Sequence, residues 1–156
     1  AIERAWAATL DRAATMPAGS SEESVDGEWS LAQTLRHLVM ATDVWLGRGI
    51  LGQDQPYHPI GLPNTDGDST AYDLSVFTHT NPTWAEILEA RAGRQSMVRE
   101  YLASVTPDVL AEPRRNPHSP DHAETVLSCL GTILGEEWEH LRYAVRDLDM
   151  LTARSH

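Results

Sequence analysis

The sequence predicts an all-α protein, a four-helix bundle with a long loop between its second and third helices. In four separate stretches, apolar residues recur three and four positions apart, the spacing of one face of an α-helix. Two of these stretches begin with a capping box. The chain has 156 residues, enough for one domain with a substantial core and too few for two. We therefore expect a single bundle domain over residues 1–156.

The first two helices are predicted from residues 2–16 and from the stretch that follows Trp29. The first is rich in alanine, and a Pro-Ala-Gly turn at 17–19 ends it. Ser30 and Gln33 have the spacing of a capping box at the start of the second. Its apolar residues cover most sides, so we expect a buried helix with Asp43 among its few solvated residues. Glycines at 47, 49 and 52 are expected to end it.

Residues 51–81 form a long connection without periodicity, which predicts a lid, a binding loop or a disordered segment. A capping box of Thr83 and Glu86 then starts a third helix, which is expected to continue to about residue 105. Residues 106–110 are predicted as a short helical turn, and residues 111–123 as a proline-rich connection. In that connection, Ser119 and Pro120 are expected to cap the final helix.

The fourth helix is predicted over residues 124–151, roughly seven turns at about 3.6 residues per turn. We assign its core-facing stripe to Leu127, Leu130, Leu134, Leu141, Val145 and Leu148. At 100° per residue Glu137 points along this stripe, while Glu136 and His140 lie one turn apart on its flank. A carboxylate on an apolar stripe is unfavourable unless a partner neutralises its charge.

One combination of residues indicates a metal-binding site. His37 lies midway along the second helix, and Glu136 and His140 lie midway along the fourth. If these helices pack together, two imidazoles and one carboxylate meet, which is the ligand set of catalytic zinc and also suits iron or nickel. The alternatives are a hydrogen-bonded core histidine at 37 and a solvated pair on the fourth helix. The spacing is neither His-Glu-x-x-His nor a paired Glu-x-x-His, so a metalloprotease and a di-iron centre are excluded.

Two segments resemble a known family. The stretch from Gly27 to Leu38, GEWSLAQTLRHL, resembles the motif of DinB/YfiT-like proteins in which a Trp-Ser or similar pair precedes the helix with the first metal-binding His. The segment from Glu136 to His140, EEWEH, resembles the fourth-helix motif of actinobacterial members. It is also similar to the Glu-x-Trp-x-His segment of mycothiol-dependent maleylpyruvate isomerases.

The resemblance covers nearly the whole chain and implies an up-down-down-up four-helix bundle. It further implies a divalent metal held by His37, Glu136 and His140, with one open coordination position. Many family members have His-x-x-x-His on the fourth helix, whereas Glu136 occupies the earlier position here, and Leu141 replaces the second His of several relatives. We do not expect the additional domain of the isomerases, so the isomerase reaction is not expected to transfer.

Three functions follow as hypotheses. The first is a metal-dependent enzyme, with zinc or nickel favoured over iron, that transfers a thiol such as mycothiol or acts on a small molecule. The second is a non-enzymatic metal-binding or stress-response module, in which His58 or His79 closes the coordination sphere. The third is a structural bundle with a degenerate site.

Glu137, Arg142 and Arg146 each have alternative roles in these hypotheses. Glu137 is expected to act as a catalytic base or to pair with an arginine such as Arg91 or Arg142, and whether Glu136 or Glu137 binds the metal is left open. Arg142 and Arg146 could hold an anionic thiol or pair with acidic neighbours.

The amino-acid composition limits the classes of binding partner that we expect. The formal net charge is −11, which argues against nucleic acid and anionic membranes and favours a small-molecule substrate or thiol. All 12 residues counted as Lys or Arg are arginines. The one cysteine, Cys129, permits no internal disulfide and fits the cytoplasm. A homodimer is expected if the protein oligomerises, because C2 dimers are the commonest soluble oligomers.

Overall fold

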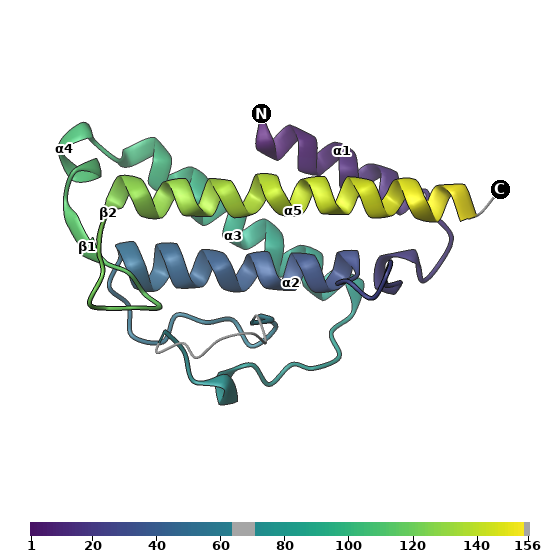
Figure 1. Cartoon of the computed structure of the whole chain (residues 1–156), viewed down its shortest axis with the longest axis horizontal. Helices are drawn as coiled ribbons and strands as arrows, with labels where there is room; N and C mark the ends of the chain where they lie inside the picture. The colour runs from purple at the N-terminus through teal and green to yellow at the C-terminus, as the bar shows by residue number, and fades with distance from the viewer. Residues whose placement is uncertain (64–70, 155–156) are drawn as a thin grey trace.

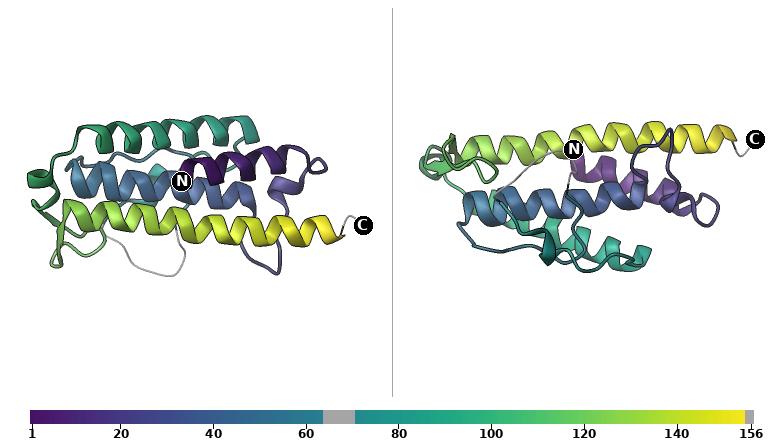
Figure 2. Two further views of the ribbon diagram at one scale, coloured as in Figure 1. Left: turned by 90° about the horizontal axis from the view of Figure 1, so that it is seen from above. Right: turned by 60° about the horizontal axis from the view of Figure 1, so that its bottom comes forward.

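The computed structural model describes residues 1–63 and 71–154 and confirms the all-α bundle. Its four long helices are α1 (Ile2–Ala14), α2 (Leu31–Thr42), α3 (Trp84–Ser104) and α5 (Val126–Arg154). In Figure 1, α1 and α5 run in one direction and α2 and α3 run in the other, which is the up-down-down-up order. Figure 2 shows α3 and α5 on either side, with α1 and α2 between them.

Shorter elements connect the long helices. They are η1 (Ser20–Glu22), η2 (Asp43–Ile50), η3 (Leu74–Val76), α4 (Pro107–Leu110) and an antiparallel hairpin of β1 (Pro113–Arg115) and β2 (Ala123–Thr125).

The long connection after η2 follows from the parallel direction of α2 and α3. Because both helices run the same way, the chain must return along the bundle before α3 begins, and Figure 1 shows it crossing beneath α2. The Arg36 side chain ties this connection to α2: its Nε donates to the Ile60 carbonyl at 2.9 Å and its Nη2 to the His79 carbonyl at 3.1 Å. The described part of the connection is therefore packed against the bundle.

Both predicted capping boxes are present. The Ser30 hydroxyl accepts from the backbone N–H of Gln33, and the Gln33 side chain accepts from the backbone N–H of Ser30. Thr83 and Glu86 form the same reciprocal pair at the start of α3. These bonds satisfy N–H groups that the first helical turn leaves without partners.

The second helix departs from the prediction beyond residue 42. Residues Asp43–Ile50 wind as a π-helix, η2, instead of continuing the α-helix. Asp43, expected in solvent, is 1% exposed, and it accepts from Arg94 and from the backbone N–H of His58. The expectation was wrong because the partners of Asp43 lie on α3 and on the long connection, far away in sequence. π-Segments are rare and occur often at functional sites.

The core-facing stripe of α5 is also rotated from the prediction. Leu127, Leu134 and Val145 are 59%, 37% and 37% exposed. The buried residues are Val126, Cys129, Leu130, Ile133, Glu137, Leu141, Ala144, Leu148 and Leu151. The prediction is confirmed for Leu130, Leu141 and Leu148. It was wrong for the other three residues, because leucines spaced seven apart drift around a straight helix of 3.6 residues per turn. Smaller residues such as Ala144 occupy the crowded side instead.

The proline-rich connection contains the small hairpin, which the sequence did not predict. Ser119 and Pro120 lie in the loop of this hairpin and do not cap α5. Thr125 and Ser128 cap it instead, since each side-chain oxygen accepts from the backbone N–H of the other residue.

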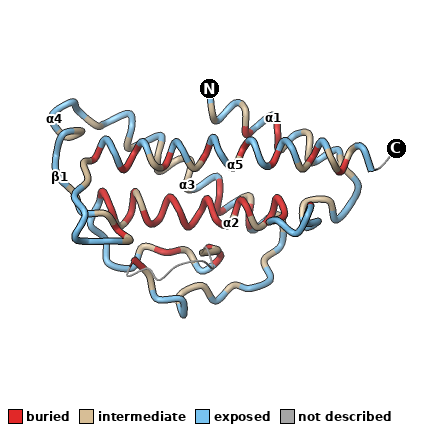
Figure 3. The backbone as a smooth tube through the Cα atoms, in the orientation of Figure 1, coloured by how far each residue is buried: buried red, intermediate tan, exposed pale blue. Residues whose placement is uncertain are grey.

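The core is centred on α2, which is buried along almost its whole length (Figure 3). It packs against α3 on one side and α5 on the other. Among the described residues, no helix is both long enough and apolar enough to cross a lipid bilayer. The central position of α2 places a polar residue from its middle, His37, inside the protein.

Candidate metal centre

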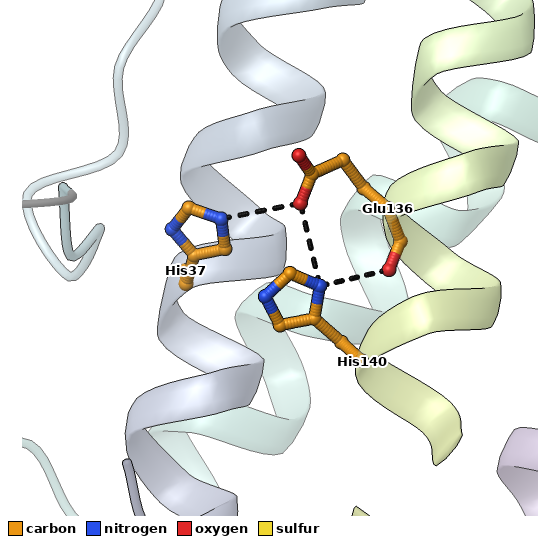
Figure 4. Close-up of side chains that lie close together, drawn as sticks. All are labelled: His37, Glu136 and His140. Carbon is orange, nitrogen blue, oxygen red and sulfur yellow. Dashed lines mark hydrogen bonds and ion pairs between the residues drawn. The ribbon is translucent and has the colours of Figure 1, made fainter. Parts of the chain in front are cut away.

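The structure brings together the three predicted ligands. His37 on α2 faces Glu136 and His140 on α5 across the space between the two helices (Figure 4). One ligand atom of each residue lies within 4.8 Å of the other two. His37 is 3% exposed, and the other two residues are half-buried. The packing of helices two and four is the condition that the metal prediction required.

A backbone carbonyl orients His37. Its Nδ1 lies 3.1 Å from the carbonyl oxygen of Leu62, so an N–H at Nδ1 leaves Nε2 facing α5. The preceding residue, Gly61, allows this close approach: a Cβ there would lie 2.9 Å from Cε1 of Phe77 and 3.1 Å from Cβ of Met40. The long connection thus positions the first ligand.

His140 is oriented in the same way. Its Nδ1 lies 2.9 Å from the backbone carbonyl of Glu136, one turn earlier on α5. An N–H donated to that carbonyl leaves Nε2 of His140 as the free ligand atom. Both histidines therefore have a backbone partner for one nitrogen and present the other nitrogen to the cluster.

The remaining contacts place the Glu136 carboxylate against Nε2 of His37, the nitrogen that has no backbone partner. Oε2 of Glu136 lies 3.3 Å from Nε2 of His37 and 3.3 Å from Nδ1 of His140. A neutral imidazole carries only one N–H, and that of His37 is directed to Leu62. Either a proton or a metal ion must therefore lie between Nε2 of His37 and the carboxylate. Hydrogen bonding to His37 lowers the pKa of Glu136, an effect that burial opposes, so the carboxylate stays ionised.

The distance between two of the candidate ligand atoms fits a metal ion. Zinc bonds to nitrogen and oxygen of roughly 2.0–2.1 Å place neighbouring ligands of a tetrahedral site about 3.3 Å apart. The separation of His37 Nε2 and Glu136 Oε2 is 3.3 Å. Three ligands leave one position of a tetrahedron open, as in catalytic zinc sites. His37 and Glu136 can thus bind a divalent ion as they stand. The ligand atoms of all three residues lie within 4.8 Å of one another, so a small movement would bring His140 into the same coordination sphere.

Comparison with known proteins decides the family. A model of the DinB superfamily matches residues 1–144. The chain belongs to the DinB superfamily. No curated protein and no solved structure gives a match. The helical bundle agrees with this membership, and the resemblance to DinB-like proteins seen in the sequence is confirmed.

Aromatic side chains surround the DinB cluster. The Trp29 ring lies 4.8 Å from the His37 ring, and the Tyr143 ring lies 5.9 Å from the His140 ring, measured between centroids. The two histidine rings are themselves 4.9 Å apart. These contacts limit rotation of both imidazoles and hold them in ligand geometry.

His118, in the loop between β1 and β2, was not predicted as a site residue. Burial lowers its pKa, while the charge of Glu136 raises it and that of His37 lowers it further, so His118 lies within electrostatic range of the cluster. Its ring packs against Trp45 at 5.7 Å and Tyr72 at 6.2 Å. No sequence motif marked this residue, because the hairpin that carries it was itself not predicted.

Glu137 faces a different neighbour. Its carboxylate accepts two hydrogen bonds from Arg91 on α3, one of them from Nη1 at 2.7 Å. Both side chains are buried, and the guanidinium packs over the Trp6 ring. Of the two roles expected for Glu137, the structure shows the ion pair. A role as catalytic base stays a prediction, which requires the carboxylate to leave Arg91.

His58 and His79 lie outside the cluster. His58 accepts from the backbone N–H of Ile60, and His79 pairs with Glu86. Both line a separate cavity beside Arg94, so neither closes the coordination sphere as the second hypothesis required.

Arg142 and Arg146 were expected to hold an anion or to pair with acidic neighbours, and Arg146 forms two ion pairs. Arg146 bonds to Glu28 and Asp147, so its charge is balanced by these two acids.

Proposed function

We propose that this DinB protein binds one divalent metal ion through His37, Glu136 and His140 and uses it in a reaction of a small molecule. Zinc or nickel suits two imidazoles and a carboxylate best, and iron is the third candidate. The observation that carries the proposal is the convergence of Nε2 of His37 on an ionised carboxylate while its other nitrogen is directed to Leu62.

The reaction class we propose is transfer of a low-molecular-weight thiol, such as mycothiol, to an electrophile. A bound divalent ion supplies Lewis acidity, which favours the thiolate form at neutral pH. The chain itself orients the site: the carbonyl of Leu62 holds one imidazole and that of Glu136 holds the other. The rings of Trp29 and Tyr143 flank the two histidines and limit their rotation. A small-molecule partner, rather than nucleic acid or membrane, fits the acidic charge.

Metal analysis tests the first half of the proposal. We would purify the chain without a His tag, dialyse it against zinc or nickel and then against buffer, and measure bound metal by mass spectrometry. We expect about one ion per chain in the wild type and less than a tenth of that in His37→Ala and His140→Ala. Protein that retains no metal after loading, while its circular dichroism shows the folded bundle, contradicts the proposal.

A thiol-consumption assay tests the second half. Mycothiol and, in parallel, cysteine are incubated with monochlorobimane and metal-loaded protein, and the fluorescent thioether is measured. We expect faster product formation with metal-loaded wild type than with metal-free protein or with Glu136→Gln. Equal rates in all three samples exclude thiol transfer to this electrophile and leave the metal site to be judged by its own measurement.

A further inference from the structure

A cavity of about 360 Å³ lies between α3 and the long connection, and none of the three metal ligands lines it. The connection contributes His58, Ile60 and His79 to its walls, and α3 contributes a face that extends from Glu86 to Arg94. An apolar cavity of about 150 Å³ holds benzene, so this space is large enough for a small organic molecule. The proposed metal chemistry makes no use of it.

Arg94 is held beside this cavity by a buried carboxylate. Its Nε and Nη2 donate to the two oxygens of Asp43 at 2.9 and 3.0 Å, and the Asp43 side chain is 1% exposed. A buried ion pair contributes little stability compared with apolar residues of similar size, but it does fix the guanidinium in place. Nη1 of Arg94 has no hydrogen-bond partner among the described residues and is not buried. Its N–H groups are therefore available to an oxygen of a ligand.

His58 supplies a second N–H donor beside Arg94. Its Nδ1 accepts from the backbone N–H of Ile60 at 3.1 Å, so the proton of the neutral ring is on Nε2. Burial and, to a smaller extent, the charge of Arg94 lower the pKa of His58, which favours the neutral ring. In the described part of the chain Nε2 has no partner, and it is not buried. The backbone N–H of His58 and Nη2 of Arg94 share one oxygen of Asp43, so the two residues are neighbours.

The rest of the α3 wall is acidic. Glu86 pairs with His79, whereas the exposed Glu89 forms no ion pair or hydrogen bond with any described residue. Glu89 lies five residues before Arg94, about 7.5 Å along the helix axis at about 1.5 Å per residue. The cavity thus has two N–H donors in one part of its wall and an unpaired carboxylate in another.

Gly93 leaves this wall without a side chain beside Arg94. A Cβ at Gly93 would meet nothing within 4 Å beyond its own helical turns, so packing against the described residues does not require glycine here. Glycine inside a helix is unfavourable relative to alanine. Space for a bound molecule is a reason for the glycine that the packing of the protein does not supply.

We propose that this cavity binds a small zwitterion with a carboxylate at one end and an ammonium group at the other, such as an ω-amino acid. The carboxylate accepts hydrogen bonds from Nη1 of Arg94 and Nε2 of His58, and the ammonium group pairs with Glu89. A simple amine leaves both donors unused, and a simple anion leaves Glu89 unpaired. Because the two ends of the site are apart along α3, 4-aminobutanoate fits it better than an α-amino acid, whose charged groups share one carbon atom. The site does not depend on the metal and is tested without it.

Three probes with the same four-carbon chain test the proposal: 4-aminobutanoate, butylamine and butanoate. Each is titrated at pH 7 and one ionic strength into metal-free ¹⁵N-labelled protein, and binding is followed through the amide signals of α3 and of residues 58–60. We expect 4-aminobutanoate to bind at least tenfold more tightly than butylamine, which lacks the charge-assisted hydrogen bonds. It should bind roughly fivefold more tightly than butanoate, which lacks only the exposed ion pair.

Two variants separate the ends of the site. His58→Asn keeps an oxygen for the backbone N–H of Ile60 but removes the Nε2 donor, so it should weaken 4-aminobutanoate roughly tenfold and leave butylamine unchanged. Glu89→Gln should weaken 4-aminobutanoate roughly fivefold and should not weaken butanoate. The matched control is Glu100→Gln, on the same helix but outside the cavity, which should bind all three probes as wild type does.

Filling the cavity completes the test. Gly93→Leu places a side chain in the cavity and should abolish binding, whereas Gly131→Leu, on the exposed surface of α5, should bind as wild type does. The proposal is overturned if no probe binds with a dissociation constant below about 10 mM, or if either half binds as tightly as 4-aminobutanoate. It is also overturned if Gly93→Leu, folded by circular dichroism, still binds, or if His58→Asn and Glu89→Gln both bind 4-aminobutanoate as wild type does.

Discussion

Glu136 and Glu137 are neighbours on one turn of α5, yet they meet opposite kinds of partner. Glu137 is turned toward α3, where a guanidinium already neutralises its charge. Glu136 is turned toward α2, where it meets a ring nitrogen of His37, and a ring nitrogen of His140 on α5 itself also lies beside it. The first carboxylate has its cation inside the protein, whereas the second has two imidazoles and no permanent cation beside it.

The difference shows how one helix serves structure and chemistry together. A guanidinium is permanently charged and binds a carboxylate through two hydrogen bonds, so the pair of Arg91 and Glu137 is closed. Imidazoles held by backbone carbonyls carry no fixed charge, so the cluster at Glu136 is completed by a proton or a metal ion. Breaking the first should cost stability, and breaking the second should cost metal binding.

The largest effect on stability is expected from breaking the ion pair of Arg91 and Glu137. Arg91→Leu leaves the Glu137 carboxylate buried without a partner, and we expect it to lower the free energy of unfolding by about 3–5 kcal/mol. Arg91→Leu combined with Glu137→Leu should recover most of the loss, because no unpaired charge remains. Urea denaturation at pH 7 measures both. The control is Arg99→Leu, which breaks the exposed pair with Glu3 and should cost less than about 1 kcal/mol.

The next largest effect is the stabilisation of the fold by zinc bound at the cluster of Glu136. At a free zinc concentration 100 times the dissociation constant, we expect the wild type to gain about 2.7 kcal/mol of unfolding free energy. Glu136→Gln should gain almost nothing from zinc, although its metal-free stability should lie within about 1 kcal/mol of wild type. Thermal and urea unfolding with and without zinc provide the comparison. A full zinc effect in Glu136→Gln would place the metal elsewhere.

A smaller effect concerns the residue that positions His37. Gly61→Ala adds a methyl group where Phe77 and Met40 already lie close, so it should move the Leu62 carbonyl away from His37. We expect zinc affinity to fall roughly tenfold, because loss of a hydrogen bond that orients a ligand typically costs 10–100-fold in metal affinity. Calorimetric titration measures the change. The control is Gly93→Ala on α3, where an added methyl group meets nothing within 4 Å beyond its own helical turns, and this variant should bind zinc as wild type does.

The smallest effect concerns Cys129, on the buried face of α5. Burial raises the pKa of its thiol from 9.0 to about 11, and the charge of Glu124 adds to the rise. Because the folded pKa lies above the unfolded one, the stability from the neutral thiol is complete below pH 9 and is lost as the pH rises toward 11. We expect a loss of up to roughly 1–2 kcal/mol, measured by urea denaturation at pH 8 and 10.5. Cys129→Ala should lack this part of the decline.

Much of the fold and of the cluster could be predicted from local patterns. The two capping boxes fixed the starts of α2 and α3 because a cap involves residues only three apart. His37, Glu136 and His140 were identified because their spacing and residue types match a ligand set, and the family motifs place them on the two helices that meet.

The features that were missed depend on contacts far apart in sequence. Burial of Asp43 needs Arg94 on α3, and no local pattern around Asp43 reports that partner. The face of α5 was misjudged because its leucines suggest one stripe while Cys129 and Ala144 fit the crowded core better. His118 lies within electrostatic range of the cluster because of a hairpin that the sequence did not predict. The sequence left open whether Arg91 or Arg142 pairs with Glu137, and the structure shows that Arg91 does.

The most direct test of the difference between the two glutamates is calorimetric titration of zinc into chelator-treated wild type, Glu136→Gln and Glu137→Gln. Glutamine at 137 can still accept a hydrogen bond from Arg91, so both variants should fold. We predict one zinc per chain in the wild type and in Glu137→Gln, and no measurable binding in Glu136→Gln. Binding that survives in Glu136→Gln but disappears in Glu137→Gln would contradict the account.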